Sequence, residues 1–239
     1  MGTVPRVLEV CVASVESALR AADGGADRLE VNLALELGGL TPTVGLVRQI
    51  QQAVSLPLLC MLRPRSAGFC YSEAEFQTLL ADIPPLIEQG VTGFVFGFLN
   101  RDRTVDARRI EQVLTITKGH ENVFHRAIDC VAEPLVALDT LVELGVDRVL
   151  TSGGASTAAQ GVAGLRQMRE YAHDRIGLVV GSGVRPENLQ TILQMTGCHQ
   201  FHGSFGNKSV DAAQPVAADD FTVTDAELVR QAKQVLMSC

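Results

Sequence analysis

The sequence alternates eight short apolar runs with eight longer amphipathic stretches, and this alternation limits the folds open to the chain more than any other feature. The short runs are rich in Val, Leu and Ile and predict strands near Val7–Cys11, Asp27–Asn32, Pro57–Arg63, Gly93–Phe98, Asn122–Ala127, Asp147–Ser152, Ile176–Gly181 and Cys198–Gly203. The longer stretches predict helices near Val15–Ala22, Val44–Ala53, Glu73–Gln89, Ala107–Thr117, Pro134–Leu144, Ala158–His173, Pro186–Met195 and Asp225–Met237. Strict alternation favours a parallel sheet covered by helices, and eight such units are typical of a closed barrel. We therefore expect an α/β fold of the TIM-barrel type, (β/α)8, that forms a single domain over residues 1–239.

A polar, alanine-rich segment at about residues 206–220 follows the eighth predicted strand. It has no apolar periodicity, so we expect a loop at the carboxyl ends of the strands. Such a loop could be a flap over the barrel mouth or merely a tolerated insertion, and the sequence favours neither.

Charge and composition exclude several classes of protein. The formal net charge is −7 and no run of Lys or Arg occurs, which is unfavourable for binding nucleic acid or an anionic membrane. No apolar stretch approaches the ~18 residues of a membrane span, and the sequence after Met1 lacks the pattern of a secretion signal. The six cysteines form no C-x-x-C pair. We therefore expect a cytoplasmic protein with free thiols.

Two glutamates occur where a barrel strand should alternate with apolar residues. Glu9 lies between Leu8 and Val10, and Glu30 lies between apolar neighbours in the same way. The apolar face of each strand belongs against the helices, so the glutamates should face the barrel interior. Because a buried carboxylate is costly without a partner, each should contact an Arg or a His.

Charged side chains also follow the carboxyl ends of several other strands. They are Arg63, Arg65, His125, Arg126, Asp129, Arg185 and, within the eighth strand, His202. Active sites of barrel enzymes are assembled at these strand ends from several strands at once. The same residues could instead form ion pairs that only brace the barrel. One or two pairs would be enough for bracing, so the size of the set favours a ligand site.

Small residues after the last two strands suggest where an anion would bind. Gly181 and Gly183 follow the seventh strand, and Gly203 and Ser204 follow the eighth, with Arg185 close by. Backbone N–H groups can approach a phosphate closely at such glycines, and this is the usual phosphate position of the fold. The glycines could also serve only the tight turns between strand and helix.

Several segments together resemble the CutC family, which is named for copper homeostasis. The matching runs are Leu8–Ser14, Gly25–Glu30, Gly38–Pro42, Arg63–Ser72 (R-P-R-x-x-G-F-x-Y-S), Phe124–Asp129 (F-H-R-A-x-D), Arg148–Gly153, Gly183–Leu189 and Phe201-His202. The resemblance implies a (β/α)8 barrel, a cytosolic location and homo-oligomers. It also implies copper as the partner, bound as Cu(I) by two cysteines at the ends of the first and second strands.

The implied copper site is incomplete in this sequence. Its first cysteine corresponds to Cys11, but its second corresponds to Asn32, whose amide oxygen is a hard and weak ligand for Cu(I). Cys70 and Cys130, in the loops after the third and fifth strands, are candidate replacement thiols. Copper binding should therefore be weak unless one of them reaches Cys11. No motif for an organic cofactor is evident.

The arginines and glycines have no use in binding a soft metal, so a second hypothesis stays open. In it, the chain is an enzyme of unassigned reaction on a small phosphorylated or carboxylated anion. Glu30 or His125 would move protons, with pKa values near neutrality. Asp129 would orient His125 or brace an arginine. The anion-binding residues would be Arg63, Arg65, Arg126 and Arg185, with Gly181, Gly183, Gly203 and Ser204.

Overall fold

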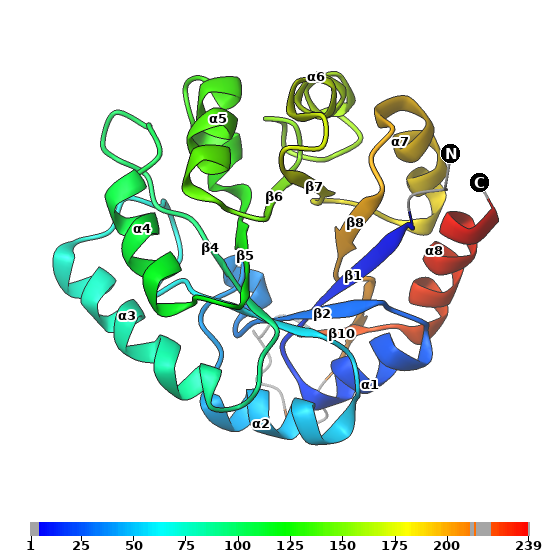
Figure 1. Ribbon diagram of the computed structural model, residues 1–239. Coiled ribbons are helices and arrows are strands. Elements are labelled where there is room, and N and C mark those ends of the chain that lie inside the picture. The colour runs from blue at the N-terminus through cyan, green and yellow to red at the C-terminus, as the bar shows by residue number, and fades with distance from the viewer. Residues whose placement is uncertain (1–4, 211–212, 214–220, 239) are drawn as a thin grey trace.

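A computed structural model of the protein describes residues 5–210, 213 and 221–238. Eight parallel strands close into a barrel in which each strand pairs with the next and β1 pairs with β8 (Figure 1). The strands are β1 Val7–Val12, β2 Arg28–Val31, β3 Leu58–Met61, β4 Gly93–Phe96, β5 Glu121–Phe124, β6 Arg148–Thr151, β7 Gly177–Val180 and β8 Gln200–Gly203. The (β/α)8 barrel predicted from the alternation is confirmed.

The helices form a ring outside the strands (Figure 1). They are α1 Val15–Asp23, α2 Val44–Ala53, α3 Glu73–Ile87, α4 Ala107–Ile116, α5 Pro134–Leu144, α6 Val162–Ala172, α7 Pro186–Thr196 and α8 Ala226–Ser238. Two short 3-10 helices, η1 (Leu35–Leu37) and η2 (Arg126–Cys130), lie in the loops after β2 and β5. None of the helices in the described part of the chain is long and apolar enough to cross a membrane.

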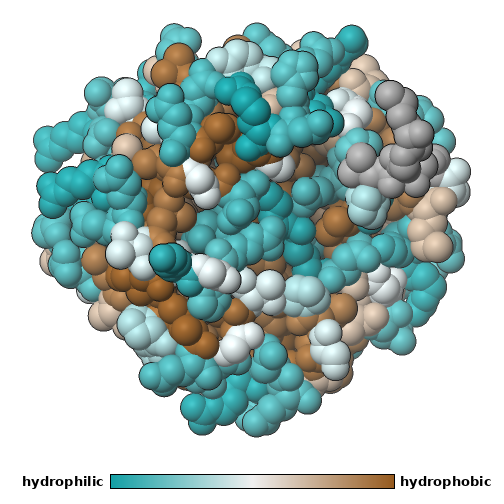
Figure 2. Space-filling model, in the orientation of Figure 1, coloured by the Kyte–Doolittle hydropathy of each residue, from teal (hydrophilic) through white to brown (hydrophobic). Residues whose placement is uncertain are grey.

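The alternation along each strand separates two apolar layers. Leu8 and Val10 belong to the main core, which lies between the strands and the helices. A smaller cluster fills the barrel interior and consists of Leu59, Met61, Val95, Val123, Leu150 and Val179. Figure 2 shows hydrophilic residues over the middle of one face of the molecule, with apolar residues between them and the edge. Each fully buried aliphatic side chain contributes about 1.5–3 kcal/mol to folding, so the two layers hold the strand ends in place.

The predicted elements differ from the observed ones mainly at their ends. Helix α6 begins at Val162, four residues later than expected, with Gly161 as its N-cap. A Cβ atom at position 161 would lie 1.8 Å from the carbonyl oxygen of Ser152, so only glycine fits this close approach. The turn before α6 is therefore decided by packing against the end of β6.

The sequence predicts a loop after β8, but the structure shows that part of this segment is a strand. Gly206–Ser209 forms strand β9, which pairs antiparallel with β10, Phe221–Thr224. The backbone N–H of Thr224 donates to Ser17 Oγ at 3.2 Å and ties this pair to α1. The polar sequence of β9 carries no alternating pattern, so its strand forms only because β10 supplies a partner. Most of the predicted loop lies outside the described residues.

Candidate functional site

A pocket of about 500 Å³ opens at the carboxyl ends of the strands. Its polar lining comes from the ends of β1, β2, β3, β5, β7 and β8 and consists of Cys11, Glu30, Asn32, Arg63, His125, Arg126, Ser182, Gly183, Arg185, His202, Gly203 and Ser204. Met61, Phe69 and Leu150 contribute apolar walls. We call this cavity the mouth pocket. It brings together most of the residues that the sequence pointed to.

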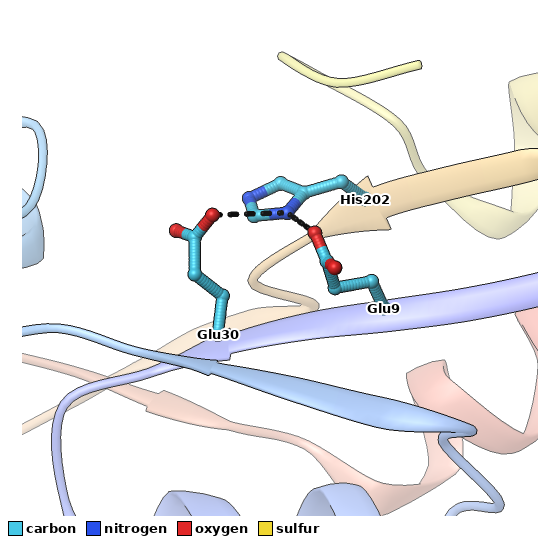
Figure 3. Close-up of side chains that lie close together, drawn as sticks. All are labelled: Glu9, Glu30 and His202. Carbon is cyan, nitrogen blue, oxygen red and sulfur yellow. Dashed lines mark hydrogen bonds and ion pairs between the residues drawn. The ribbon is translucent and has the colours of Figure 1, made fainter. Parts of the chain in front are cut away.

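Glu9 on β1, Glu30 on β2 and His202 on β8 lie close together (Figure 3), and Glu30 and His202 line the mouth pocket. His202 Nδ1 lies 2.6 Å from a carboxylate oxygen of Glu9 and 4.0 Å from one of Glu30. Glu9 also accepts a hydrogen bond from Arg28 Nε. Both glutamates are 2% exposed, so the prediction that they face inward and contact an Arg or a His is confirmed.

The charges in this cluster compensate one another. Burial alone would raise the pKa of Glu9, but Arg28 and His202 outweigh it and lower that pKa to about 2. Burial alone would lower the pKa of His202, but Cys11, Glu30 and Glu9 raise it well above its ordinary value. The ligand atoms of Glu9, Glu30 and His202 lie within 4.8 Å of one another, close enough to hold a metal ion. A proton held on His202 competes with such an ion, so we interpret the cluster as a buried ion-pair network.

A second polar layer lies below, toward the amino ends of the strands. Gln200 Oε1 accepts from Arg28 Nη2 at 2.8 Å and from Arg148 Nη1 at 3.1 Å. Arg148 Nη2 also lies 2.6 Å from a carboxylate oxygen of Glu121. Sequence reasoning missed Arg28 and Arg148, although Arg28 precedes Glu30 by two residues and therefore shares its face of β2.

Arg63 lines the mouth pocket, but most of its N–H donors form hydrogen bonds to backbone carbonyl oxygens of the protein itself. Its Nη1 donates to the carbonyl oxygens of Leu37 and Gly39 at 3.1 and 2.9 Å, and its Nη2 donates to that of Ala67 at 2.9 Å. Arg63 Nε is buried without a partner among the described residues. Arg63 therefore brings positive charge to the pocket while it holds the loops after β2 and β3 together.

His125 ends β5 and is 3% exposed, with its ring in the wall of the mouth pocket. Its Nδ1 accepts a hydrogen bond from the backbone N–H of Ala127 at 3.2 Å. Burial and the positive charge of Arg63 lower the pKa of His125 to about 3. The near-neutral pKa expected from the sequence is therefore wrong, because the ring has the cations Arg63 and Arg126 near it and no carboxylate partner among the described residues.

Asp129 lies outside the lining of the mouth pocket and does not orient His125. Its carboxylate accepts from Arg126 Nε at 3.0 Å, from Thr151 Oγ1 at 2.6 Å and from the backbone N–H groups of Ser152 and Gly154, each at 3.0 Å. Of the two roles expected for Asp129, the structure shows the bracing of an arginine. Arg126 is thereby held at the rim of the pocket with its side chain 40% exposed.

The residues expected to bind an anion converge only in part. Gly183 and Arg185, after β7, and Gly203 and Ser204, at the end of β8, line the mouth pocket. Gly181 is not part of the lining. A Cβ atom there would lie 2.6 Å from Leu150 Cδ1, so this glycine makes room for packing inside the barrel.

Three further candidates lie away from the mouth pocket. Arg65 pairs with Glu75 at 2.5 Å and stacks on Tyr71 with its guanidinium carbon 5.0 Å from the ring centre. Cys70 and Cys130 are exposed free thiols, and neither lines the pocket. The structure does not bring these three side chains to the others, and the pairing with Glu75 of α3 turns Arg65 away.

The lining of the mouth pocket contains one thiol among the described residues, Cys11, which is 8% exposed. Asn32 occupies the neighbouring strand end, and its Nδ2 donates to a carboxylate oxygen of Glu30 at 2.9 Å. Cu(I) prefers soft ligands such as thiolates, and an amide already bonded to a carboxylate does not supply one. Cys11 and Asn32 therefore fit a two-thiolate copper site poorly.

Comparisons with known proteins agree with the resemblance in the sequence. The chain matches the CutC family over residues 6–207. It is 44% identical to a CutC family protein of Treponema denticola over 82% of this chain and 79% of that protein. It is 39% identical to the human protein named copper homeostasis protein cutC homolog, over 94% of this chain and 86% of that one. The crystal structure of CutC from Streptococcus agalactiae superposes with a TM-score of 0.80 at 31% identity and covers 83% of this chain and 98% of that one. The chain therefore belongs to the CutC family.

Proposed function

We propose that the chain takes part in copper homeostasis, the process in the name of its human relative, and that its mouth pocket binds a small phosphorylated or carboxylated molecule. In this proposal the acid/base groups of the pocket act on the bound molecule. A cytosolic location and a homo-oligomeric state belong to the same proposal, carried over from the family.

The anion-binding part of this proposal rests on one observation. Arg63, Arg126 and Arg185 come from the ends of three different strands and surround one cavity, in a chain whose net charge is −7. Guanidinium groups suit carboxylate and phosphate because they present paired N–H donors. Gly183 and Ser204 line the same side of the pocket as Arg185, at the usual phosphate position of this fold.

We expect titration calorimetry to detect binding of inorganic phosphate and sulfate, and Arg185→Ala to weaken it about tenfold or more, because a charge-assisted hydrogen bond is lost. Arg185 is exposed, so its removal should leave the fold intact. Arg166→Ala is the matched control, since Arg166 is an exposed residue of α6 paired with Glu170. The absence of binding at ~10 mM phosphate, where even a millimolar Kd would fill most sites, would contradict the proposal.

Copper itself is the second candidate ligand. Cys11 favours it, because a thiol that lines a pocket next to His202 is placed to reach a bound ion. Asn32 disfavours it, since the site then has one thiolate instead of two. We therefore propose that any Cu(I) bound at Cys11 is held weakly.

A further inference from the structure

The ring of His125 lines the mouth pocket and carries a single hydrogen-bond donor. Because Nδ1 accepts the backbone N–H of Ala127, the neutral ring carries its proton on Nε2. Nε2 is buried and has no hydrogen-bond partner among the described residues. A buried donor left without a partner is unfavourable, and a ligand oxygen placed against it would remove that cost.

The ring of His125 is held in one orientation by its surroundings. A Cβ atom at Gly97 would lie 2.3 Å from His125 Cε1, so the chain after β4 fits against the ring without space for a side chain. Phe69 packs on the ring with its centroid 4.8 Å away. Nε2–H is therefore fixed in place before any ligand arrives.

The same ring stays uncharged at physiological pH. The pKa of about 3 means that the ring is neutral, because its burial and the cations Arg63 and Arg126 oppose a second proton. A neutral imidazole gives a hydrogen bond to an oxygen without transferring its proton outright. It can therefore stabilise an oxygen on which negative charge develops.

Glu30 supplies the complementary group in the same pocket. One of its carboxylate oxygens, Oε1, accepts from Asn32 Nδ2 at 2.9 Å. The other, Oε2, is buried and lacks a hydrogen-bond partner in the described part of the chain. Two residues that line the mouth pocket thus carry one fixed donor, on His125, and one carboxyl oxygen without a hydrogen-bond donor, on Glu30.

We infer that the mouth pocket accepts a small phosphorylated carbonyl compound, whose carbonyl oxygen is bound by His125 Nε2–H and whose neighbouring carbon exchanges a proton with Glu30. The inference rests on the proposed anion pocket, with the phosphate held by Arg185, Gly183 and Ser204. The pairing of the two groups points to this chemistry, because a donor alone or a carboxylate alone would serve many ligands.

The reaction needs no oxidant or reductant. The Glu30 carboxylate takes a proton from the carbon next to the carbonyl, and the electrons of that C–H bond form a carbon–carbon double bond. The electrons of the carbonyl π bond move to its oxygen, which becomes an enolate oxygen hydrogen-bonded to His125 Nε2–H. Return of the proton from Glu30 to the same carbon regenerates the starting compound. Where that carbon carries a hydroxyl group, the hydroxyl proton passes to the enolate oxygen, and the proton from Glu30 then returns to the former carbonyl carbon to give the isomeric carbonyl compound.

Two compounds that both contain a phosphate distinguish binding at the phosphate end of the pocket from binding at His125. In 2-phosphoglycolate a carboxylate takes the place of the enolate, whereas glycerol 3-phosphate has no such group. We expect 2-phosphoglycolate to bind about tenfold or more tightly than glycerol 3-phosphate, because a charged acceptor strengthens the bond from Nε2–H. His125→Phe should abolish this difference without weakening glycerol 3-phosphate, and His125→Gln, which keeps an N–H donor, should restore part of it. Arg185→Ala should weaken both probes equally.

The proton transfer is tested in D2O with a panel of three- to six-carbon aldose and ketose phosphates, by following loss of the NMR signal of the hydrogen next to the carbonyl. We expect exchange on at least one member, and we expect Glu30→Gln to abolish it while 2-phosphoglycolate still binds. Exchange on no member, or equal binding of the two probes by the wild type, would overturn the inference and leave the anion pocket standing. Failure of both probes to bind would instead remove the proposed function itself.

Discussion

Cys11 and Asn32 stand at adjacent strand ends, and their side chains differ in the property that matters for copper. Cys11 offers a thiol in the wall of the mouth pocket, next to His202. The Asn32 amide instead bonds to Glu30 and helps to orient that carboxylate. At this position the side chain therefore serves the polar network of the pocket rather than a soft metal.

Replacing Asn32 by cysteine should create the missing ligand. We expect Asn32→Cys to raise the affinity for Cu(I) by about tenfold or more in competition with a calibrated chelator, because two thiolates suit Cu(I) better than one. Cys11→Ser should remove what binding the wild type has, whereas Cys70→Ser, at an exposed thiol outside the pocket, should change nothing. Tight stoichiometric binding by the wild type, equal to that of Asn32→Cys, would restore the copper site as the main function.

At the scale of elements, the pocket depends on short connections that hold one strand end against the next. Asp129 in η2 accepts hydrogen bonds from Thr151 and from the backbone of Ser152 and Gly154. These bonds join the loop after β5 to the loop after β6. They also hold in place the segment that begins with His125 and Arg126.

Asp129→Ala should therefore destabilise the protein, although Asp129 itself is not part of the pocket lining. We expect the free energy of unfolding in urea to fall by about 1–3 kcal/mol or more, because the buried donors of this network lose their acceptor. Asp102→Ala is the control, since the exposed Asp102 accepts hydrogen bonds from Thr104 in its own turn. If the two variants unfold at the same urea concentration, the network contributes little and the connection is held by other contacts.

At the scale of the whole molecule, closure of the barrel brings the first strand against the last. Glu9 on β1 and His202 on β8 face each other in register and form a buried ion pair. Arg28 on β2 bonds to the second oxygen of Glu9. The closure thus depends on a charged contact as well as on backbone hydrogen bonds and apolar packing.

The lowered pKa of Glu9 gives the stability of the barrel a defined pH dependence. The stabilising contribution of Glu9 is present above pH 4.5 and is lost as the pH falls toward 2, where the folded carboxylate takes up a proton. We expect Glu9→Gln to lower the free energy of unfolding at pH 7 by about 3–5 kcal/mol, because Arg28 and His202 lose their buried counter-charge.

Denaturant unfolding between pH 7 and pH 2 measures this effect. The difference in the free energy of unfolding between the wild type and Glu9→Gln should become smaller below pH 4.5. Glu16 forms an exposed ion pair with Arg20, so the free energy of unfolding of Glu16→Gln should follow that of the wild type at every pH. A gap that stays constant down to pH 2 would show that the loss comes from packing and not from charge.

Much of the barrel and part of the site follow from local patterns in the sequence. The alternation of apolar runs predicts the eight units, and the position of Glu9 between Leu8 and Val10 predicts that it faces inward. The position of the Arg65 side chain could not be predicted from such local patterns. Arg65 lies next to a strand end, as Arg63 does, but its pairing with Glu75 turns it away from the pocket. The choice of partner depends on a helix ten residues further along the chain.

The sequence by itself determined the order of elements, the closed topology and the faces of the strands, because these depend on periods of 2 and 3.6 residues that are written along the chain. Only the tertiary structure decided the charge state of His125, which depends on Gly97, Arg63 and Ala127 meeting around one ring. It likewise decided the pairing of β9 with β10. Such contacts join residues from separate elements, and no local period records which of them will meet.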